Sequence, residues 1–124
     1  MVILDTCALI ELCLEEPGLK AQTLKRIQEG SEVLSVSFAE IALKLKKGAL
    51  ELNLTAKDLL DKFLEIPEVT IVDINVKCWL DAIDLEWHHK DPADRLIVAY
   101  AQSQKIPVVT SDKLIKKFYR NVLW

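Results

Sequence analysis

Four acidic residues occupy comparable places along the chain, each at the end of a predicted strand or in the first turn of the helix that follows. They are Asp5, Glu40, Asp94 and Asp112. In an open parallel sheet these places share the carboxyl edge, where ligands bind, so four acids distant in sequence can converge on one pocket. Two carboxylates about 5 Å apart repel by roughly 3 kcal/mol at an effective dielectric of about 20. Such a cluster therefore needs something that offsets the repulsion.

A hard divalent cation is the natural compensation, because Mg²⁺ and Mn²⁺ prefer carboxylate oxygens as ligands. Helix N-termini reduce the repulsion further, since the helix dipole favours the ionised form of an acid. A metal held in this way can activate a water molecule, and a second metal can stabilise the leaving oxygen of a phosphodiester. The positions of the acids therefore predict a metal site suited to phosphodiester hydrolysis.

Helix capping is the alternative explanation for each acid taken alone. Residues 37–40, Ser-Phe-Ala-Glu, have the pattern of a capping box, in which Glu40 would bond to the backbone of Ser37. Asp91 suits an N-cap because Pro92 follows it at the first helical position. Asp112 could cap the last helix in the same way. Both interpretations stay open for each acid, although four such acids in four elements are harder to explain by capping alone.

Hydrophobic patterning predicts the elements that must position these acids. Short apolar runs indicate strands at 1–4, 33–36, 69–72 and 107–109, and a small edge strand at 121–124. Helices are expected over 7–15, 19–29, 37–47, 55–65, 76–85, 92–104 and 111–119. Because helices separate the strands, the connections should be right-handed crossovers. The predicted fold class is α/β, with a mostly parallel sheet of four to five strands covered by helices on both faces.

Length and composition are those of one globular domain spanning residues 1–124. Apolar residues make up 51% of the chain and charged residues 28%, with three Gly and four Pro, which excludes disordered and fibrous classes. No apolar run approaches the roughly 20 residues of a membrane helix, and the first residues lack a signal pattern, so we expect a cytoplasmic protein without membrane association. Three cysteines without close pairing are interpreted as buried apolar fillers: Cys7, Cys13 and Cys78.

The net charge of −3 argues weakly against a nucleic-acid ligand, which usually requires an excess of Lys and Arg. Two bound divalent cations would change the formal charge from −3 to +1 and make the site locally cationic. The basic residues that could contact phosphates, or simply form solvated helix faces, are Lys44, Lys46, Lys47, Lys113, Lys116, Lys117 and Arg120. An acidic protein can thus still accept a polyanion.

Four segments carry a family resemblance. They are VILDTCALI with Asp5, LSVSFAEIALKLKKGALEL with Glu40, HKDPADRLIVAYA with Asp94, and VVTSDKLI with Asp112. In this order they resemble the PIN-domain nucleases, and within that family the VapC-type toxins of prokaryotic toxin–antitoxin pairs. The third segment is the most specific, and the similarity is loose only between residues 51 and 85 and after residue 119.

This resemblance implies a Mg²⁺- or Mn²⁺-dependent endoribonuclease that acts as the toxin of such a pair by hydrolysing RNA. The implied partners are the RNA substrate, a small antitoxin protein that blocks the site, and a second copy in a homodimer. The first two helices and the helix from Ser37 resemble the family's antitoxin and dimer surfaces. The four acids become the catalytic metal ligands, above all Asp5 and Asp94.

The resemblance also implies roles for residues around the acids. Groups that could orient a water or an acid, with helix capping as the alternative, are Thr6, Thr110, Ser111 and, chiefly as an N-cap, Asp91. Candidate substrate contacts are Arg95, His89, Lys47 and Lys113. For Arg95 the alternative is an ion pair with an acid, and for His89 it is loop packing. Trp79 and Trp87 are interpreted as core or dimer contacts, since no basic run surrounds them.

Three other functions remain as alternatives. A PIN-domain nuclease could act in RNA processing or on DNA outside a toxin pair, or the domain could be a catalytically silent binding module. A receiver domain is a more distant possibility, because it needs an acidic pair after its first strand and this chain has a lone Asp5 there. A small antitoxin gene immediately upstream would favour the toxin.

Overall fold

Five parallel strands form one sheet with the order β3-β2-β1-β4-β5. The structure, a computed structural model, describes residues 1–124. The strands are β1 (Val2–Leu4), β2 (Ser31–Leu34), β3 (Val69–Val72), β4 (Val108–Val109) and β5 (Val122–Leu123). The chain builds the sheet outward from β1 to β3 and then returns to the other side of β1, where β4 lies. The parallel α/β fold predicted from the sequence, with its small edge strand, is confirmed.

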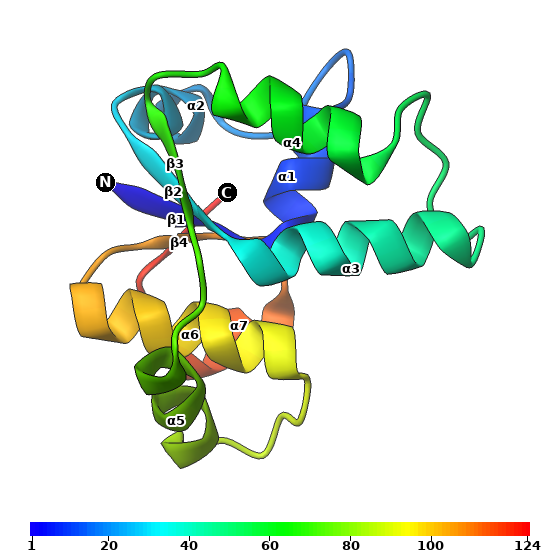
Figure 1. Ribbon diagram of the computed structural model, residues 1–124. Coiled ribbons are helices and arrows are strands. Elements are labelled where there is room, and N and C mark those ends of the chain that lie inside the picture. The colour runs from blue at the N-terminus through cyan, green and yellow to red at the C-terminus, as the bar shows by residue number, and fades with distance from the viewer.

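Seven helices cover the two faces of this sheet (Figure 1). They are α1 (Thr6–Leu12), α2 (Ala21–Gln28), α3 (Ser35–Lys46), α4 (Ala56–Leu64), α5 (Val76–Asp84), α6 (Pro92–Gln104) and α7 (Lys113–Phe118). Figure 1 shows α1, α2 and α4 on one side of the sheet and α5, α6 and α7 on the other, while α3 extends beyond its edge. No helix has the length and apolar character needed to cross a membrane.

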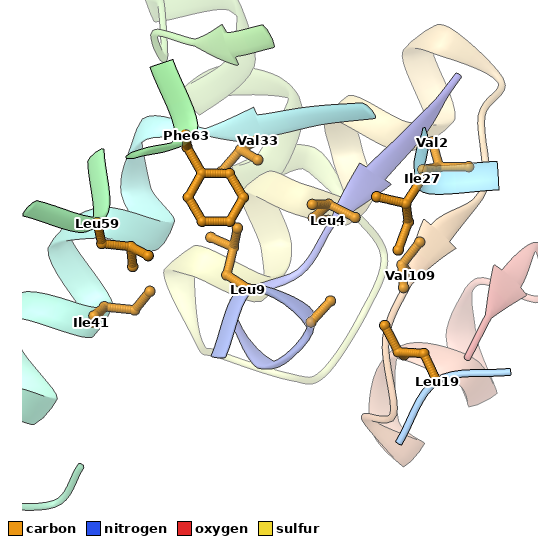
Figure 2. Close-up of a cluster of buried hydrophobic side chains, with 11 residues drawn as sticks. Val2, Leu4, Leu9, Leu19, Ile27, Val33, Ile41, Leu59, Phe63 and Val109 are labelled. Atoms are coloured by element: carbon orange, nitrogen blue, oxygen red, sulfur yellow. The ribbon is translucent and has the colours of Figure 1, made fainter. Parts of the chain in front are cut away.

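Alternation along β1 divides the core into two layers, because successive side chains of a strand point to opposite faces. Val2 and Leu4 pack with side chains from α1, α2, α3 and α4, among them Leu9 and Phe63 (Figure 2). Ile3 faces the other way and packs in the cluster to which α5 and α6 contribute. The strand that carries Asp5 at its end is thereby buried on both faces, which fixes the position of this acid.

The start of α3 differs from the sequence prediction. Strand β2 ends at Leu34 and α3 begins at Ser35, two residues earlier than expected, and its N-cap residue makes no side-chain cap. Ser37 is instead buried inside the first turns of the helix, within 3.1 Å of the Thr6 hydroxyl. The capping box considered as the alternative explanation for Glu40 is therefore absent. A capping box is present at α4, where Thr55 and Asp58 bond to each other's backbone N–H.

Helix α6 begins and ends as its sequence predicts. Asp91 is the N-cap, its Oδ1 accepts from the Asp94 N–H at 3.0 Å, and Pro92 occupies the first turn. At the other end Lys105 adopts a left-handed conformation with φ of 57° and closes the helix. Six residues of α6 are buried, so this helix is anchored in the core and gives Asp94 a fixed base.

Candidate active site

The four acids predicted from the sequence come to the carboxyl edge of the sheet, next to the point where the strand order reverses between β1 and β4. Asp5 follows β1, Asp94 lies in the first turn of α6, Asp112 caps α7 and Glu40 lies on α3. Ligands of open α/β sheets bind at this switch point. Four separate elements thus bring carboxylates to one region.

Asp5 lies at the centre of this region and is the most buried of the acids, with 4% of its surface exposed. Its Oδ1 accepts from the Thr6 N–H at 2.7 Å, and its Oδ2 accepts from the Thr110 hydroxyl at 2.6 Å and the Cys7 thiol at 3.3 Å. Burial raises the pKa of Asp5, these hydrogen bonds oppose the rise, and repulsion from Asp112 adds to it. The protein therefore holds Asp5 by donors that favour its ionised form.

Glu40 is connected to the same region through Thr6. The Thr6 hydroxyl donates to Glu40 Oε1 at 2.6 Å, across a sequence separation of 34 residues. Burial raises the pKa of Glu40, the hydrogen bond from Thr6 lowers it, and repulsion from Asp91 and Asp5 raises it again. Glu40 thus faces the acid region and does not cap its own helix.

Asp94 carries the largest pKa shift of the four. Its side chain is 14% exposed, and its Oδ2 lies 2.6 Å from His89 Nε2. Burial raises the pKa of Asp94 to about 7, the hydrogen bond to His89 opposes the rise, and repulsion from Asp5, Asp91 and Asp112 increases it. A carboxyl group whose pKa is raised toward neutrality by burial, with other carboxylates nearby, is a marker of a functional site.

The segment after β4 supplies support as well as an acid. Thr110 donates its hydroxyl to Asp5 and accepts from the Asp112 N–H at 3.0 Å. Asp112 uses Oδ1 to cap α7, accepting from the N–H groups of Leu114 at 2.7 Å and Ile115 at 3.1 Å. Its predicted capping role is confirmed, and Oδ2 points to no hydrogen-bond partner within the protein. Ser111 lies 3.7 Å from the Cys7 thiol and touches none of the acids through a hydrogen bond.

Cys7 is a site residue that sequence reasoning missed. It was expected to be a buried apolar filler, whereas its half-buried thiol contacts Asp5, Thr110 and Ser111. Burial and the neighbouring Asp5 raise the pKa of the thiol, so it is a neutral donor at physiological pH. Its place two residues after Asp5, in the first turn of α1, was the available signal. Cys13 and Cys78 do pack against the two core layers.

The donors of this region suit a hard divalent cation in their chemistry. All four acids offer carboxylate oxygens, the ligand type that Mg²⁺ and Mn²⁺ prefer. In this structure, however, no group of three or more His, Cys, Asp or Glu side chains is arranged closely enough to hold an ion together. Mutual repulsion opposes a closer arrangement of ionised carboxylates. The acids therefore supply suitable ligand atoms along one edge of the sheet. They are not arranged around a single ion position.

The structure does not place Arg95 in an ion pair with an acid or leave it free to contact RNA, as the sequence had suggested. All five of its N–H groups donate to backbone carbonyls at 2.6–3.2 Å; the acceptors are Ala82, Ile83, Leu85, Trp87 and His89. A guanidinium group has five donors and no more. Arg95 therefore holds the end of α5 and the connection to α6, and has no donor left for a phosphate.

Of the other candidate substrate contacts, His89 bonds to Asp94. Lys47 and Lys113 make no hydrogen bond or ion pair with any of the four acids. Trp87 stacks on Phe118 of α7 with ring centroids 4.7 Å apart and lies 4.9 Å from the His89 ring, so it packs as expected. Trp79 is 44% exposed on α5 and is no core residue. The cations proposed for phosphate contacts are all exposed: Lys44, Lys46, Lys47, Lys113, Lys116, Lys117 and Arg120.

Comparison with known proteins agrees with this architecture. The model of the PIN domain family matches residues 2–121. A toxin–antitoxin complex from Klebsiella pneumoniae contains a similar chain, with 17% identity, a TM-score of 0.71, and coverage of 100% of this chain and 97% of that one. No curated protein matches the sequence.

Two further solved structures share the fold. VapBC2 from Rickettsia felis, bound to a DNA fragment from its promoter, has 20% identity and a TM-score of 0.69, covering 99% of this chain and 96% of that one. VapC20 of Mycobacterium tuberculosis, described as a sarcin–ricin loop cleaving toxin, has 10% identity and a TM-score of 0.66, covering 96% and 95%. The family match spans nearly the whole chain and includes all four acids, so this protein belongs to the PIN domain family.

Proposed function

We propose that the chain is a metal-dependent endoribonuclease that hydrolyses RNA phosphodiester bonds and acts as the VapC-type toxin of a toxin–antitoxin pair in the cytoplasm. The observation that carries this proposal is the meeting of Asp5, Glu40, Asp94 and Asp112 at one sheet edge, where burial, with added repulsion from Asp5, Asp91 and Asp112, raises the pKa of Asp94 to about 7. Membership of the PIN domain family supports the nuclease class. The similarity to chains of toxin–antitoxin complexes supports the biological role.

Asp5 and Asp94 would hold the Mg²⁺ or Mn²⁺ ion, with Glu40 and Asp112 binding directly or through water. When bound, the ion supplies activation of a water nucleophile and stabilisation of charge on the phosphate. Thr110 and Thr6 keep Asp5 and Glu40 in place through hydrogen bonds of 2.6 Å each. Lys113 directly follows Asp112, and Lys47 closes α3, the helix that carries Glu40; both are exposed and would contact the RNA backbone.

Replacing Glu40 by glutamine is a prediction that tests the charge of this residue alone. The amide oxygen can still accept from Thr6 at the present 2.6 Å contact, while one carboxylate is lost from the cluster. We expect RNA cleavage to fall by about tenfold to a hundredfold with no fall in melting temperature. Cleavage rates and thermal melts of the purified variant check this. Unchanged cleavage would remove Glu40 from the site.

The antitoxin would bind a groove of about 610 Å³ between α1, α2 and α4. Its lining is mainly apolar, including Leu12, Ile27 and Phe63, and carries Lys62 and Glu68 as charged groups. An apolar groove of this kind accepts an amphipathic segment of a small partner protein. Two of these helices, α1 and α2, belong to the set that, with the helix from Ser37, resembles the family's antitoxin and dimer surfaces.

The homodimer would form through α5, which exposes an apolar stripe. Val76, Trp79, Leu80 and Ile83 recur at helical spacing and are 44% to 72% exposed, and contiguous exposed apolar faces mark interfaces. Lys77, next to the stripe, pairs with Asp81 of the same helix, with Nζ 2.6 Å from Oδ2. A second copy related by a two-fold axis would therefore bind through apolar contact along the stripe.

Ile83→Glu is expected to convert this dimer into a monomer, because two glutamates would face the apolar stripe across the two-fold axis. Light scattering after size-exclusion chromatography measures the mass. Leu64→Glu, at a 63% exposed leucine at the end of α4, is the matched control and should leave the mass unchanged. A dimer that survives Ile83→Glu would place the interface elsewhere.

Expression in bacteria tests the proposed function as a whole. We expect the wild-type chain to arrest growth and to leave cuts at defined positions in cellular RNA, mapped by primer extension. Asp94→Asn, expressed to the same level, should do neither. Growth without arrest and intact RNA, with soluble folded protein, would favour a PIN-domain nuclease outside a toxin pair or a catalytically silent binding module.

A further inference from the structure

The connection between α5 and α6, residues 85–91, has no regular secondary structure and yet is held from three directions. Arg95 binds its carbonyls from α6, Trp87 stacks on Phe118 of α7, and His89 bonds to Asp94. Such a segment would ordinarily be among the mobile parts of a fold. These three contacts fix the position of residues 85–91 relative to α6 and α7.

Arg95 is suited to this task in a way that lysine is not. Its planar guanidinium presents five N–H donors in a rigid fork, and all five are used on the backbone between Ala82 and His89. Backbone carbonyls at the end of a helix otherwise lack partners. One side chain therefore satisfies the end of α5 and fixes the path of the chain as far as His89.

The fixed segment ends on the acid region. The His89 carbonyl accepts a hydrogen bond from Arg95 Nη1 at 3.0 Å, and His89 Nε2 lies 2.6 Å from Asp94 Oδ2. Asp94 and Arg95 are adjacent in the first turn of α6, so the same turn carries the acid and the group that positions the histidine beside it. Within the protein, one hydrogen bond, from His89, reaches Oδ2 of Asp94 and none reaches Oδ1.

We propose that Arg95 is a positioning residue of the active site, which acts through His89 to orient the Asp94 carboxylate so that Oδ1 faces the other acids. This inference rests on the proposed function, because it assigns Asp94 to the metal. Partners that orient a ligating carboxylate typically change metal affinity or activity by 10- to 100-fold. His89 then orients a ligand and does not contact substrate.

The test compares Arg95→Lys, His89→Ala and the double variant with Arg26→Lys, the same change at an exposed arginine of α2. We expect Arg95→Lys and His89→Ala each to weaken Mn²⁺ binding, measured by calorimetry, by about tenfold or more. Both should lower kcat for RNA cleavage with little change in KM. The double variant should be no worse than His89→Ala alone, because both changes break one connected path. Arg26→Lys should resemble the wild type.

Several results would overturn the inference while leaving the proposed function intact. Effects of Arg95→Lys and His89→Ala that multiply would show that the two residues act separately. A lower melting temperature with unchanged Mn²⁺ affinity and unchanged kcat would show that Arg95 has a structural role only. A raised KM with unchanged kcat would show substrate contact. A readout independent of metal is the NMR order parameter of the His89 amide, which should fall in Arg95→Lys only. If the wild-type protein itself does not bind Mn²⁺, the proposed function is contradicted.

Discussion

Asp94→Asn is expected to reduce metal-dependent RNA cleavage by at least about a hundredfold while making the metal-free protein more stable at pH 7.5. The activity falls because the variant lacks the charge that would bind the cation, and replacing even an indirect partner of a metal costs up to 100-fold. The stability rises because the pKa of Asp94 is raised from 3.8 to about 7, mainly by burial, with repulsion from Asp5, Asp91 and Asp112. The ionised carboxylate is therefore unfavourable in the folded state.

Cleavage assays and thermal melts in chelator measure the two effects of Asp94→Asn. Asp61→Asn is the matched control, because Asp61 is exposed on α4, away from the acid region. It should change neither quantity. A variant at position 94 that is inactive but less stable would indicate a structural role for Asp94, and an active variant would remove it from the site.

Metal binding is expected to weaken steeply as the pH falls through 7. A folded-state pKa of about 7 for Asp94 means that the metal-free protein gains a proton there, whereas a cation requires the ionised form. The ionised fraction falls by about 25-fold between pH 7.5 and 5.5, so apparent Mn²⁺ affinity should fall by about the same factor. Calorimetry at the two pH values, in buffers of different ionisation enthalpy, measures the affinity and the proton released.

The raised pKa of Asp94 also makes the stability of the metal-free protein depend on pH. Because the folded pKa of Asp94 lies above its unfolded value, its contribution to stability is present at pH below about 4 and is lost as the pH rises through about 7. Added Mn²⁺ should therefore raise the melting temperature more at pH 7.5 than at pH 5.5. An affinity that does not depend on pH would contradict the assignment of Asp94 as the titrating ligand.

The fold was predictable where local patterns and packing agree. The strand at 69–72, the N-cap at Asp91 with its proline, and the end of α6 at Gln104 all carry signals within a few residues of each other. The start of α3 was not predictable in this way. Ser37 looks like an N-cap from its neighbours, but its hydroxyl is buried beside Thr6, 31 residues away, and that contact leaves no local signal.

The candidate site shows the same division. The acids were found because acidic residues after strands are visible in the sequence. Arg95 was misassigned because its partners are backbone carbonyls, which every residue has and which no residue type signals. Cys7 was missed because two of its three partners, Thr110 and Ser111, lie more than 100 residues away, and its place two residues after Asp5 was the only local signal. Long-range hydrogen bonds are what sequence reasoning could not supply.

The proposed function requires the acids at one sheet edge to hold a divalent cation that drives RNA cleavage. Its most direct test is cleavage of a mixed pool of structured RNAs by purified protein with Mg²⁺, with Mn²⁺ and with chelator, alongside Asp94→Asn. We predict discrete cuts with either metal, none with chelator and none with the variant. Cuts that persist in chelator or in the variant would contradict the account, as would intact RNA from a folded wild-type protein free of antitoxin.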